Sequence, residues 1–256
     1  MGKSKPTLGL AMICQNEEIH IASSIAQFFT AVDDIVVVDG GSSDDSVMWA
    51  ERMGARVFHR PFDNDFSAQK NYALDQLDTD WVYLHDPDER LEPTLIEILP
   101  LLIDIEAGQQ FLEAGGILPS SPERFDCFGI ARRNFIDGVQ TDIYPDYQYR
   151  LFRKNCRFER PVHELLTGWD KRTEVDFNHA TLEDPARFNI LHYKSGTRQE
   201  EQDVCYADIE KKYDLETLAN IRKKAKAKAK EEEKSKRKKQ KKKGAKKEER
   251  GKDENA

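Results

Sequence analysis

Four short apolar segments near the N-terminus constrain the fold more than any other feature of the sequence. Each has the length of a β-strand and is largely apolar, and stretches of helical character separate them. Strands buried on both faces and alternating with helices predict a parallel sheet covered by helices on both sides. The strand segments are LGLAMI (8–13), IVVV (35–38), ARVFHR (55–60) and WVYLHD (81–86), and the helical stretches are residues 22–29, a helix beginning near Ser43, and SAQKNYALDQL (67–77).

The following segment and the composition fit one α/β core. Residues 93–126 indicate helix with glycine and proline punctuation, and CFGIARRNF (127–135) follows as a further strand. A chain of 256 residues with 38% hydrophobic residues builds one good core, or one core with appendages. No CxxC pair occurs, which argues against a zinc knuckle and a disulfide framework; the four cysteines are Cys14, Cys127, Cys156 and Cys205.

A strongly basic tail follows an acidic body. Residues 221–256 contain 18 Lys and Arg against 7 Asp and Glu, a formal charge of +11, and because the whole chain carries −7, residues 1–220 carry −18. The tail lacks aromatic residues, so it cannot bury enough surface to fold alone. We expect a domain over residues 1–212 and a helical to disordered Lys-rich tail over 213–256. The tail is either an electrostatic tether for nucleic acid, another polyanion or an anionic membrane surface, or a solubilising tail.

The sequence gives no signal for membrane insertion or secretion. It has no run of eighteen apolar residues, and its N-terminus, MGKSKPTLGL, has no apolar stretch long enough for a secretory signal. We therefore expect a cytoplasmic protein with no transmembrane segment, and peripheral contact with a membrane surface is an option for the tail.

Polar residues follow the predicted strands at their carboxyl ends, where parallel sheets bind ligands. Unpaired carboxylates at the end of a buried strand are costly, so the pair Asp86 and Asp88 predicts a bound cation. Together with Glu17 and Asp39, this acidic rim suits a hydrogen-bonded base and ribose, with a divalent metal between the carboxylates and a diphosphate. A structural role is open for Asp39 as a turn acid, for Glu17 in a first helical turn and for residues 42–44 as helix caps.

Six ordered blocks of the sequence resemble those of a known enzyme family. MICQNEE, DDIVVVDGGSSDDSV, FDNDFSAQKNYAL, WVYLHDPDE, YRLFRKNCRFERPVHE and ILHYKSG look, in that order, like blocks of family 2 glycosyltransferases with the GT-A fold, and most resemble the branch of lipopolysaccharide core glucosyltransferases. The resemblance covers residues 8–212. It implies a GT-A type α/β fold, with a Rossmann-like, mostly parallel sheet and helices on both faces, followed by a C-terminal helix and the tail.

The resemblance implies a set of donor-binding residues. Glu17 and Asp39 match positions that hold the ribose and the uracil-type base of a nucleotide sugar, so the expected donor is a UDP sugar. Lys70 matches the polar end of the family's FSAARN block, with Lys in place of the usual Arg. It can offset phosphate charge, but the bidentate geometry of Arg is lost. Asp86 matches the first acid of the family's DxD pair.

A divalent metal, Mn²⁺ or Mg²⁺, is the cofactor that the resemblance implies. Asp86 and Asp88 match the DxD pair, with Asp88 as the direct metal ligand. His192 matches a late histidine that completes the metal and diphosphate site in several relatives; packing at the end of a strand is the structural alternative. Related sequences often carry HYGY there, and Lys194 departs from that pattern.

The implied chemistry is inverting displacement at an anomeric carbon, which needs one general base and no covalent sugar intermediate. Glu164 matches the acid of the family's HE pair and is the expected base, with His163 beside it. Alternatively, Glu164 anchors an arginine of the YRLFR strand. Asp142 and Asp146 are the reserve candidates for the base. Tyrosines 144, 147 and 149 around them form either a stacking platform for an acceptor sugar or ordinary core and surface.

Other protein classes explain the sequence less well. A haloacid dehalogenase phosphatase needs Thr or Val where this chain has Arg90, and a sugar nucleotidyltransferase needs a Gly-rich phosphate loop that CQNEEIH does not offer. Two alternatives stay open: a retired transferase fold that binds nucleic acid or polyanions through the tail, and an active transferase on modified DNA. We predict an inverting, metal-dependent hexosyltransferase that moves a sugar from a nucleoside diphosphate sugar to a hydroxyl of a glycan or lipopolysaccharide-type saccharide.

Overall fold

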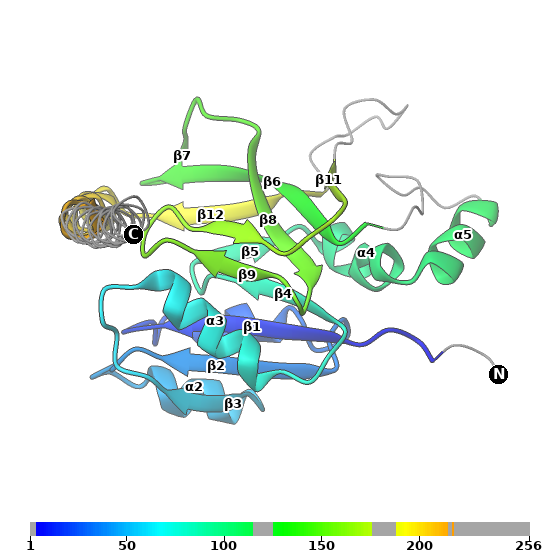
Figure 1. The fold of residues 1–256 in the computed structure, drawn as a ribbon, viewed down its shortest axis with the longest axis horizontal. Helices are drawn as coiled ribbons and strands as arrows, with labels where there is room; N and C mark the ends of the chain where they lie inside the picture. The colour runs from blue at the N-terminus through cyan, green and yellow to red at the C-terminus, as the bar shows by residue number, and fades with distance from the viewer. Residues whose placement is uncertain (1–3, 115–124, 176–187, 215–216, 218–256) are drawn as a thin grey trace, which may run out of the picture. The chain divides into compact units, whose positions relative to one another are not determined.

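The computed structural model of the chain describes residues 4–114, 125–175, 188–214 and 217 (Figure 1). The chain divides into two compact units, Met1–Tyr206 and Ala207–Ala256, and residues 207–214 of the second unit are helical. The basic tail lies outside the described residues, so the expectations for it stay predictions. Within the described part, no helix has the length and apolar character needed to cross a membrane.

The predicted parallel sheet forms the first half of the molecule. β1 (Leu8–Cys14) lies between β2 (Asp34–Asp39) and β4 (Trp81–His85), and β3 (Arg56–His59) pairs with β2 at the edge. All three pairings are parallel. The four apolar segments are therefore strands as predicted, and their carboxyl ends share one edge of the sheet (Figure 1).

The rest of the main sheet has mixed direction. β4 pairs antiparallel with β8 (Asp146–Arg153), β8 pairs antiparallel with β6 (Cys127–Ile136), and β6 pairs parallel with β12 (Ile190–Lys194). β12 in turn pairs antiparallel with β5 (Glu89–Leu91), and this register sets His192 opposite Glu89 on one side and Asn134 on the other. Late strand residues thus lie beside the turn that follows β4.

Three shorter pairings complete the strands. β7 (Val139–Gln140) pairs antiparallel with the end of β6, and β11 (Arg172–Val175) pairs parallel with its beginning. β9 (Arg157–Glu159) and β10 (Leu165–Thr167) form a separate two-stranded sheet. β9 also contacts α3, which brings the segment around Glu164 toward the carboxyl ends of the parallel strands.

Helices cover both faces of the parallel strands because alternate strand residues are buried on opposite sides. One apolar cluster joins Leu10 and Tyr83 to residues of α1, α2 and α4, and the other joins Val38 and Leu84 to residues of α3. The sequence pattern of strands apolar on both faces is thereby explained. The helices are α1 (Ile21–Ala26), α2 (Ser46–Arg52), α3 (Phe66–Gln76), α4 (Pro93–Ile103) and α5 (Ile105–Glu113).

Helix α1 buries a different face from the one that the spacing predicted. The spacing grouped Phe29 with Ile25, but Phe29 is 53% exposed, whereas Phe28 is fully buried. α1 ends at Ala26, so helical spacing no longer applies beyond it. The ring of Phe28 instead packs on β4, with its centroid 5.3 Å from that of Tyr83 and 4.9 Å from that of His85.

Candidate active site

Hydrogen bonds join the loops after β1 and β2 and set the direction of Glu17. The backbone N–H of Glu17 donates to Oγ of Ser46 at 2.6 Å, and that of Asn16 donates to Oγ of Ser42 at 2.9 Å. The side chain of Asn16 accepts from the N–H of Ser43 at 2.8 Å. Helix α2 begins at Ser46, so the expectation of a helix starting near Ser43 is off by one turn, and these serines connect two loops.

Asp39 holds its own turn together. Its carboxylate accepts from the N–H of Gly41 at 3.1 Å and of Ser42 at 3.0 Å, and Nδ1 of His59 lies 3.3 Å away. Burial alone would raise the pKa of Asp39, but the hydrogen bonds from Ser42, His59 and Gly41 lower it. The turn role weighed for Asp39 is therefore present, and Gly40 rather than Asp39 lines a pocket at the carboxyl ends of the parallel strands. Its predicted role in base binding stays a prediction.

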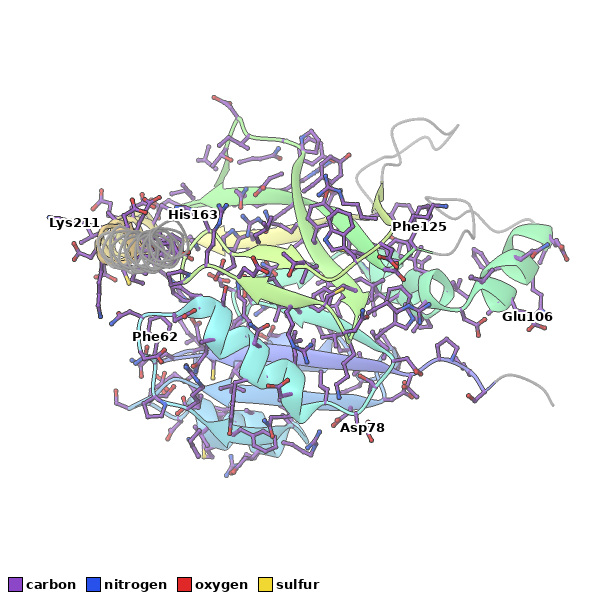
Figure 2. The ribbon with its side chains drawn as sticks, viewed as in Figure 1. Phe62, Asp78, Glu106, Phe125, His163 and Lys211 are labelled. Atoms are coloured by element: carbon purple, nitrogen blue, oxygen red, sulfur yellow. The ribbon has the colours of Figure 1, made fainter. Side chains whose placement is uncertain are left out.

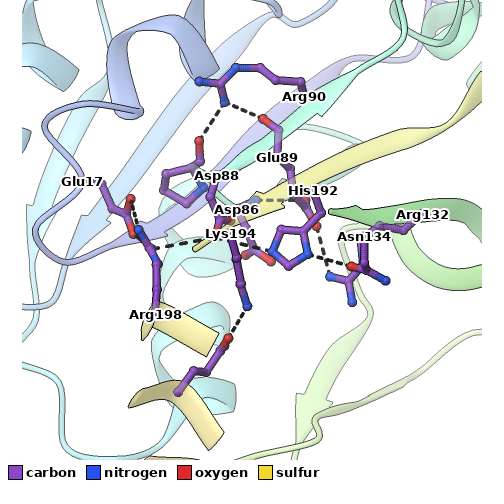
Figure 3. A network of polar contacts seen from close by, with 12 residues as sticks. Glu17, Asp86, Asp88, Glu89, Arg90, Arg132, Asn134, His192, Lys194 and Arg198 are labelled. Atoms are coloured by element: carbon purple, nitrogen blue, oxygen red, sulfur yellow. Dashed lines mark hydrogen bonds and ion pairs between the residues drawn. The ribbon is translucent and has the colours of Figure 1, made fainter. Parts of the chain in front are cut away.

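The two acids of the DPD turn contact different partners. The half-buried carboxylate of Asp86 accepts a hydrogen bond from Nη2 of Arg150. Burial would raise the pKa of Asp86, but the charge of Arg150, with help from Lys70 and Arg132, lowers it far below its usual range. Asp88, by contrast, contacts His192 and Arg198 on the pocket side (Figure 3).

Glu89 follows the DPD turn and holds that turn from inside the core. It is fully buried, and its Oε1 lies 2.6 Å from Nη2 of Arg150 and 3.3 Å from Nη1 of Arg132. Its Oε2 accepts from the N–H of Asp86 at 3.3 Å. The sequence reasoning did not select Glu89, although an acid placed directly after a strand-end pair of acids was visible in HDPDER.

His192 has a fixed orientation toward Asp88. Nδ2 of Asn134 donates to Oδ2 of Asp146 at 3.0 Å, so the amide oxygen of Asn134 faces the imidazole and accepts from Nδ1 of His192 at 2.8 Å. Nε2 of His192 is thereby directed at Oδ2 of Asp88, 3.4 Å away. Two atoms with lone pairs facing one another require either a proton on Nε2 or a cation bound by both.

The charge state of Asp88 agrees with this arrangement. Asp88 is 6% exposed, and burial alone would raise its pKa. The hydrogen bond and charge of His192, aided by the charge of Arg198, outweigh burial and lower the pKa, which keeps the carboxylate ionised. An ionised carboxylate oxygen and a directed imidazole nitrogen form a pair suited to a divalent cation.

The fit of a divalent metal rests on this pair of residues. Across residues 4–114, 125–175 and 188–214, no three His, Cys, Asp or Glu side chains are grouped so as to hold a metal ion. Asp88 and His192 are in place, whereas Asp86 is engaged by Arg150. Mg²⁺ commonly takes one or two carboxylates and completes its coordination with water and substrate phosphates, so the pair is sufficient on the protein side.

Arg198 contributes a cation that the sequence reasoning missed. It lies in the helical residues 196–206, where it forms an ion pair with both carboxylate oxygens of Glu17, and its Nη2 lies 3.8 Å from Oδ2 of Asp88 (Figure 3). Burial raises the pKa of Glu17 and Arg198 opposes this. Glu17 and Arg198 are 181 positions apart, and no local pattern could have paired them.

Lys70 and Glu164, predicted for separate roles, contact each other. Nζ of Lys70 lies 3.0 Å from Oε1 of Glu164 and 5.3 Å from the ring centre of Phe158. Of the two β8 arginines that Glu164 could anchor, Arg150 contacts Asp86 and Glu89, and Nε of Arg153 lies 3.8 Å from Oδ1 of Asp126. Asn71 fixes this region by two hydrogen bonds with the backbone of Phe158, at 2.8 and 2.9 Å.

A pocket of about 980 Å³ gathers most of these groups. It lies at the carboxyl ends of the parallel strands, and residues 198–206 contribute to its wall. His163 lines it, whereas Glu164 and the exposed Asp142 do not. Of the predicted site residues, the pocket is lined by Glu17, Lys70, Asp86, Asp88, Asp146 and His192.

The parallel sheet with helices on both faces, and polar groups gathered at its strand ends, define an α/β domain of the kind that binds ligands at the carboxyl ends of its strands. Residues 10–110 match the glycosyl transferase family 2 model. A lipopolysaccharide core biosynthesis glycosyltransferase of Rhizobium meliloti is 32% identical over 104 residues, which are 39% of this chain and 38% of that protein.

Further relatives match parts of the chain. A TPR repeat-containing protein of Synechococcus elongatus is 29% identical over 171 residues, 65% of this chain and 37% of that protein. An uncharacterized glycosyltransferase of Rickettsia felis is 37% identical over 84 residues, 33% of this chain and 29% of that protein. The chain thus spans less than two fifths of the length of these three curated relatives.

Solved structures show only a distant likeness. The glucosyl-3-phosphoglycerate synthase of Mycobacterium tuberculosis, solved with Mn²⁺, UDP and glucosyl-3-phosphoglycerate, has a TM-score of 0.36 at 23% identity, covering 52% of this chain and 45% of that one. S. aureus TarS 1–349 has a TM-score of 0.40 at 16% identity, covering 58% and 47%. Scores this low carry no argument about substrates.

Proposed function

We propose that the protein is a metal-dependent, inverting glycosyltransferase that moves a sugar from a nucleoside diphosphate sugar to a hydroxyl acceptor. One observation carries the proposal: Nε2 of His192 is directed by Asn134 at Oδ2 of Asp88, inside the pocket at the strand ends of a family 2 glycosyltransferase domain. A divalent cation bound there would offset the charge that develops on the leaving diphosphate.

The donor would bind along the first two strand ends. Glu17 lines the pocket from the loop after β1 and Gly40 from the loop after β2, on the same side as Asp88. We assign the ribose to Glu17 and the base to the turn held by Asp39, and a UDP sugar stays the expected donor. Arg198 already occupies both oxygens of Glu17, so the donor ribose must share or displace that contact.

Glu164 is our candidate for the general base. Asp146 lines the pocket, but its carboxylate accepts hydrogen bonds from Arg132, Asn134 and Gln148, which occupy its lone pairs. Glu164 sits next to the pocket-lining His163 and contacts the pocket-lining Lys70. A base in this position takes the proton of the attacking hydroxyl. Before transfer, the ammonium group of Lys70 balances the negative charge of the Glu164 carboxylate.

The acceptor is proposed from the family context. A relative named as a lipopolysaccharide core biosynthesis glycosyltransferase favours a saccharide hydroxyl. The pocket offers a less polar wall from β6 and the β7–β8 loop for such an acceptor, formed by Phe135, Ile136 and Ile143.

Binding and slow hydrolysis of a panel of nucleotide sugars, measured with Mn²⁺ or Mg²⁺ and with chelator, test the function. We expect one donor to bind and to be hydrolysed only with metal, and Asp88→Asn to lose this response. Asp78→Asn is the control, because Asp78 is exposed before β4, at the end of the strands away from the pocket-lining His163 (Figure 2). Absence of donor binding under every metal condition would favour the alternative of a retired transferase fold.

A further inference from the structure

Lys194 lines the pocket, and its ammonium group contacts a neutral side chain, the amide of Gln202. Its Nζ donates to Oε1 of Gln202, and no carboxylate of the described residues lies within ion-pair distance of it. The other pocket-lining lysine, Lys70, contacts Glu164 at 3.0 Å. An ammonium group has three donors, and the amide of Gln202 takes one of them.

Ion pairs account for nearly all the other charges of the pocket wall. Asp86 contacts Arg150. Asp146 lies 2.8 Å from Arg132. Glu17 is paired with Arg198, and Asp88 with His192. The remaining lining acids, Glu201 and Asp203, are exposed on the helix. The pocket therefore has a candidate metal site at Asp88. It also has, at Lys194, an ammonium group that is not paired with a carboxylate of the described residues.

The position of Lys194 places its charge close to the reacting groups. It follows His192 by two residues on β12 and lines the same pocket. Arg198 lines the same pocket, and its bond with Glu17 uses two of its five N–H donors. Figure 3 shows both cations within the network around Asp88.

We propose that Lys194, with the remaining N–H groups of Arg198 beside it, forms a phosphate-binding site in this pocket. The proposal rests on the proposed function, because it adds an anion subsite to the same reaction site. The phosphate comes either from the diphosphate of the donor or from a phosphorylated acceptor, and both present the same oxygen acceptors to the two cations.

Calorimetric titrations of the full chain with Mn²⁺ separate the two sources of phosphate. One titration compares UDP with uridine, and the other adds inorganic phosphate to protein saturated with UDP. If the donor supplies the phosphate, Lys194→Met loses about tenfold or more of the preference for UDP over uridine. If the acceptor supplies it, that preference is kept and the binding of inorganic phosphate falls by a similar factor. Lys194→Arg should restore most of either loss.

Two control variants test the assignment itself. Lys5→Met removes an exposed lysine remote from the pocket, and should change neither titration. Lys70→Met removes the pocket lysine that has a carboxylate partner and should change both less than Lys194→Met does. Wild-type behaviour of Lys194→Met in both titrations, or equal losses in Lys5→Met, would overturn the phosphate site while leaving the transferase proposal intact.

Inorganic pyrophosphate distinguishes failure of the site from failure of the proposed function. If the wild type binds no nucleoside diphosphate but binds pyrophosphate, and Lys194→Met weakens that binding about tenfold, the phosphate site stands and the transferase function does not. If pyrophosphate binding is also absent or independent of Lys194, both proposals fail.

Discussion

Asn134 fixes His192: its amide oxygen lies 2.8 Å from Nδ1, and its amide nitrogen donates to Asp146 at 3.0 Å. A carboxylate only accepts, so this chain of contacts sets the amide orientation and then the imidazole tautomer. The nitrogen that remains, Nε2, faces Asp88. Residues that orient a metal-binding histidine in this way tune the affinity of the site without touching the metal.

Removal of that orienting contact should weaken metal binding. Asn134→Ala leaves Asp88 and His192 in place but lets the imidazole rotate, so we expect the affinity for Mn²⁺ to fall by about 10- to 100-fold. Titration of Mn²⁺ followed by electron paramagnetic resonance measures the free ion directly. Asn155→Ala is a matched control, because Asn155 bonds the backbone of Gly168 and does not line the pocket. Unchanged Mn²⁺ affinity in Asn134→Ala would contradict the orienting role assigned to Asn134.

The buried pair of Arg150 and Glu89 should carry a large stability effect. Their side chains are 6% and 0% exposed, and Arg150 also neutralises Asp86. Arg150→Met removes the nearest cation of the buried Glu89 carboxylate and leaves it with the longer, 3.3 Å contact to Arg132, so we expect a loss of about 3–5 kcal/mol in the free energy of unfolding. Urea denaturation followed by circular dichroism measures it.

A matched surface pair provides the comparison for Arg150→Met. Arg56 contacts Asp34 with 49% of its side chain exposed, so Arg56→Met should cost about 1 kcal/mol or less. Equal losses in the two variants would contradict the importance assigned to burial of Arg150 and Glu89.

His85 should give the stability a pH dependence between about 4 and 6.5. It is fully buried, and burial lowers its pKa to about 4, although Glu89 opposes the shift. An unfolded histidine titrates near 6.5, so the unfolded state binds the proton first as pH falls. The contribution of His85 to the free energy of unfolding is therefore fully present above about pH 6.5. It decreases by about 3 kcal/mol in total as the pH falls toward 4, and this group causes no further change below that pH.

A leucine variant isolates the contribution of His85 from that of other groups. His85→Leu keeps an apolar side chain in the same core position and removes the titration, so the slope of unfolding free energy against pH should flatten between pH 4 and 6.5. An identical slope in wild type and His85→Leu would contradict the assignment.

The sequence predicted the parts of the fold and site that local patterns determine. The strands from Leu8 to His85 were found because hydrophobic runs and helical periodicity extend over a few residues. Asp88 was selected from its place at the end of a buried strand and His192 through the family resemblance, and the structure places them together. The pairing of β12 with β5 and β6 brings His192 close to Asp88. This register depends on contacts between segments that are distant in the sequence, so it leaves no local signal.

The ion pairs that sequence reasoning missed depend on which of several acidic side chains a given cation contacts. Arg198 lies in a helix rich in charges, and nothing in KSGTRQEE distinguishes the arginine that meets Glu17. Lys70 was expected to face phosphate, yet it contacts Glu164. Coulomb attraction has no sequence periodicity, so which of several acids a cation meets is decided by how the strands and loops pack.

The contact between Lys70 and Glu164 leads to the prediction that decides the base. Glu164→Gln keeps the side-chain shape and a hydrogen-bond acceptor but removes basicity, so we expect transfer to fall by about 10²–10⁴-fold with donor affinity unchanged. Steady-state transfer and donor titration on the same preparations separate the two effects. Asp142→Asn, an exposed acid outside the pocket, should keep near-normal turnover. If Glu164→Gln retains turnover and Asp142→Asn loses it, the proton passes to Asp142 instead of Glu164.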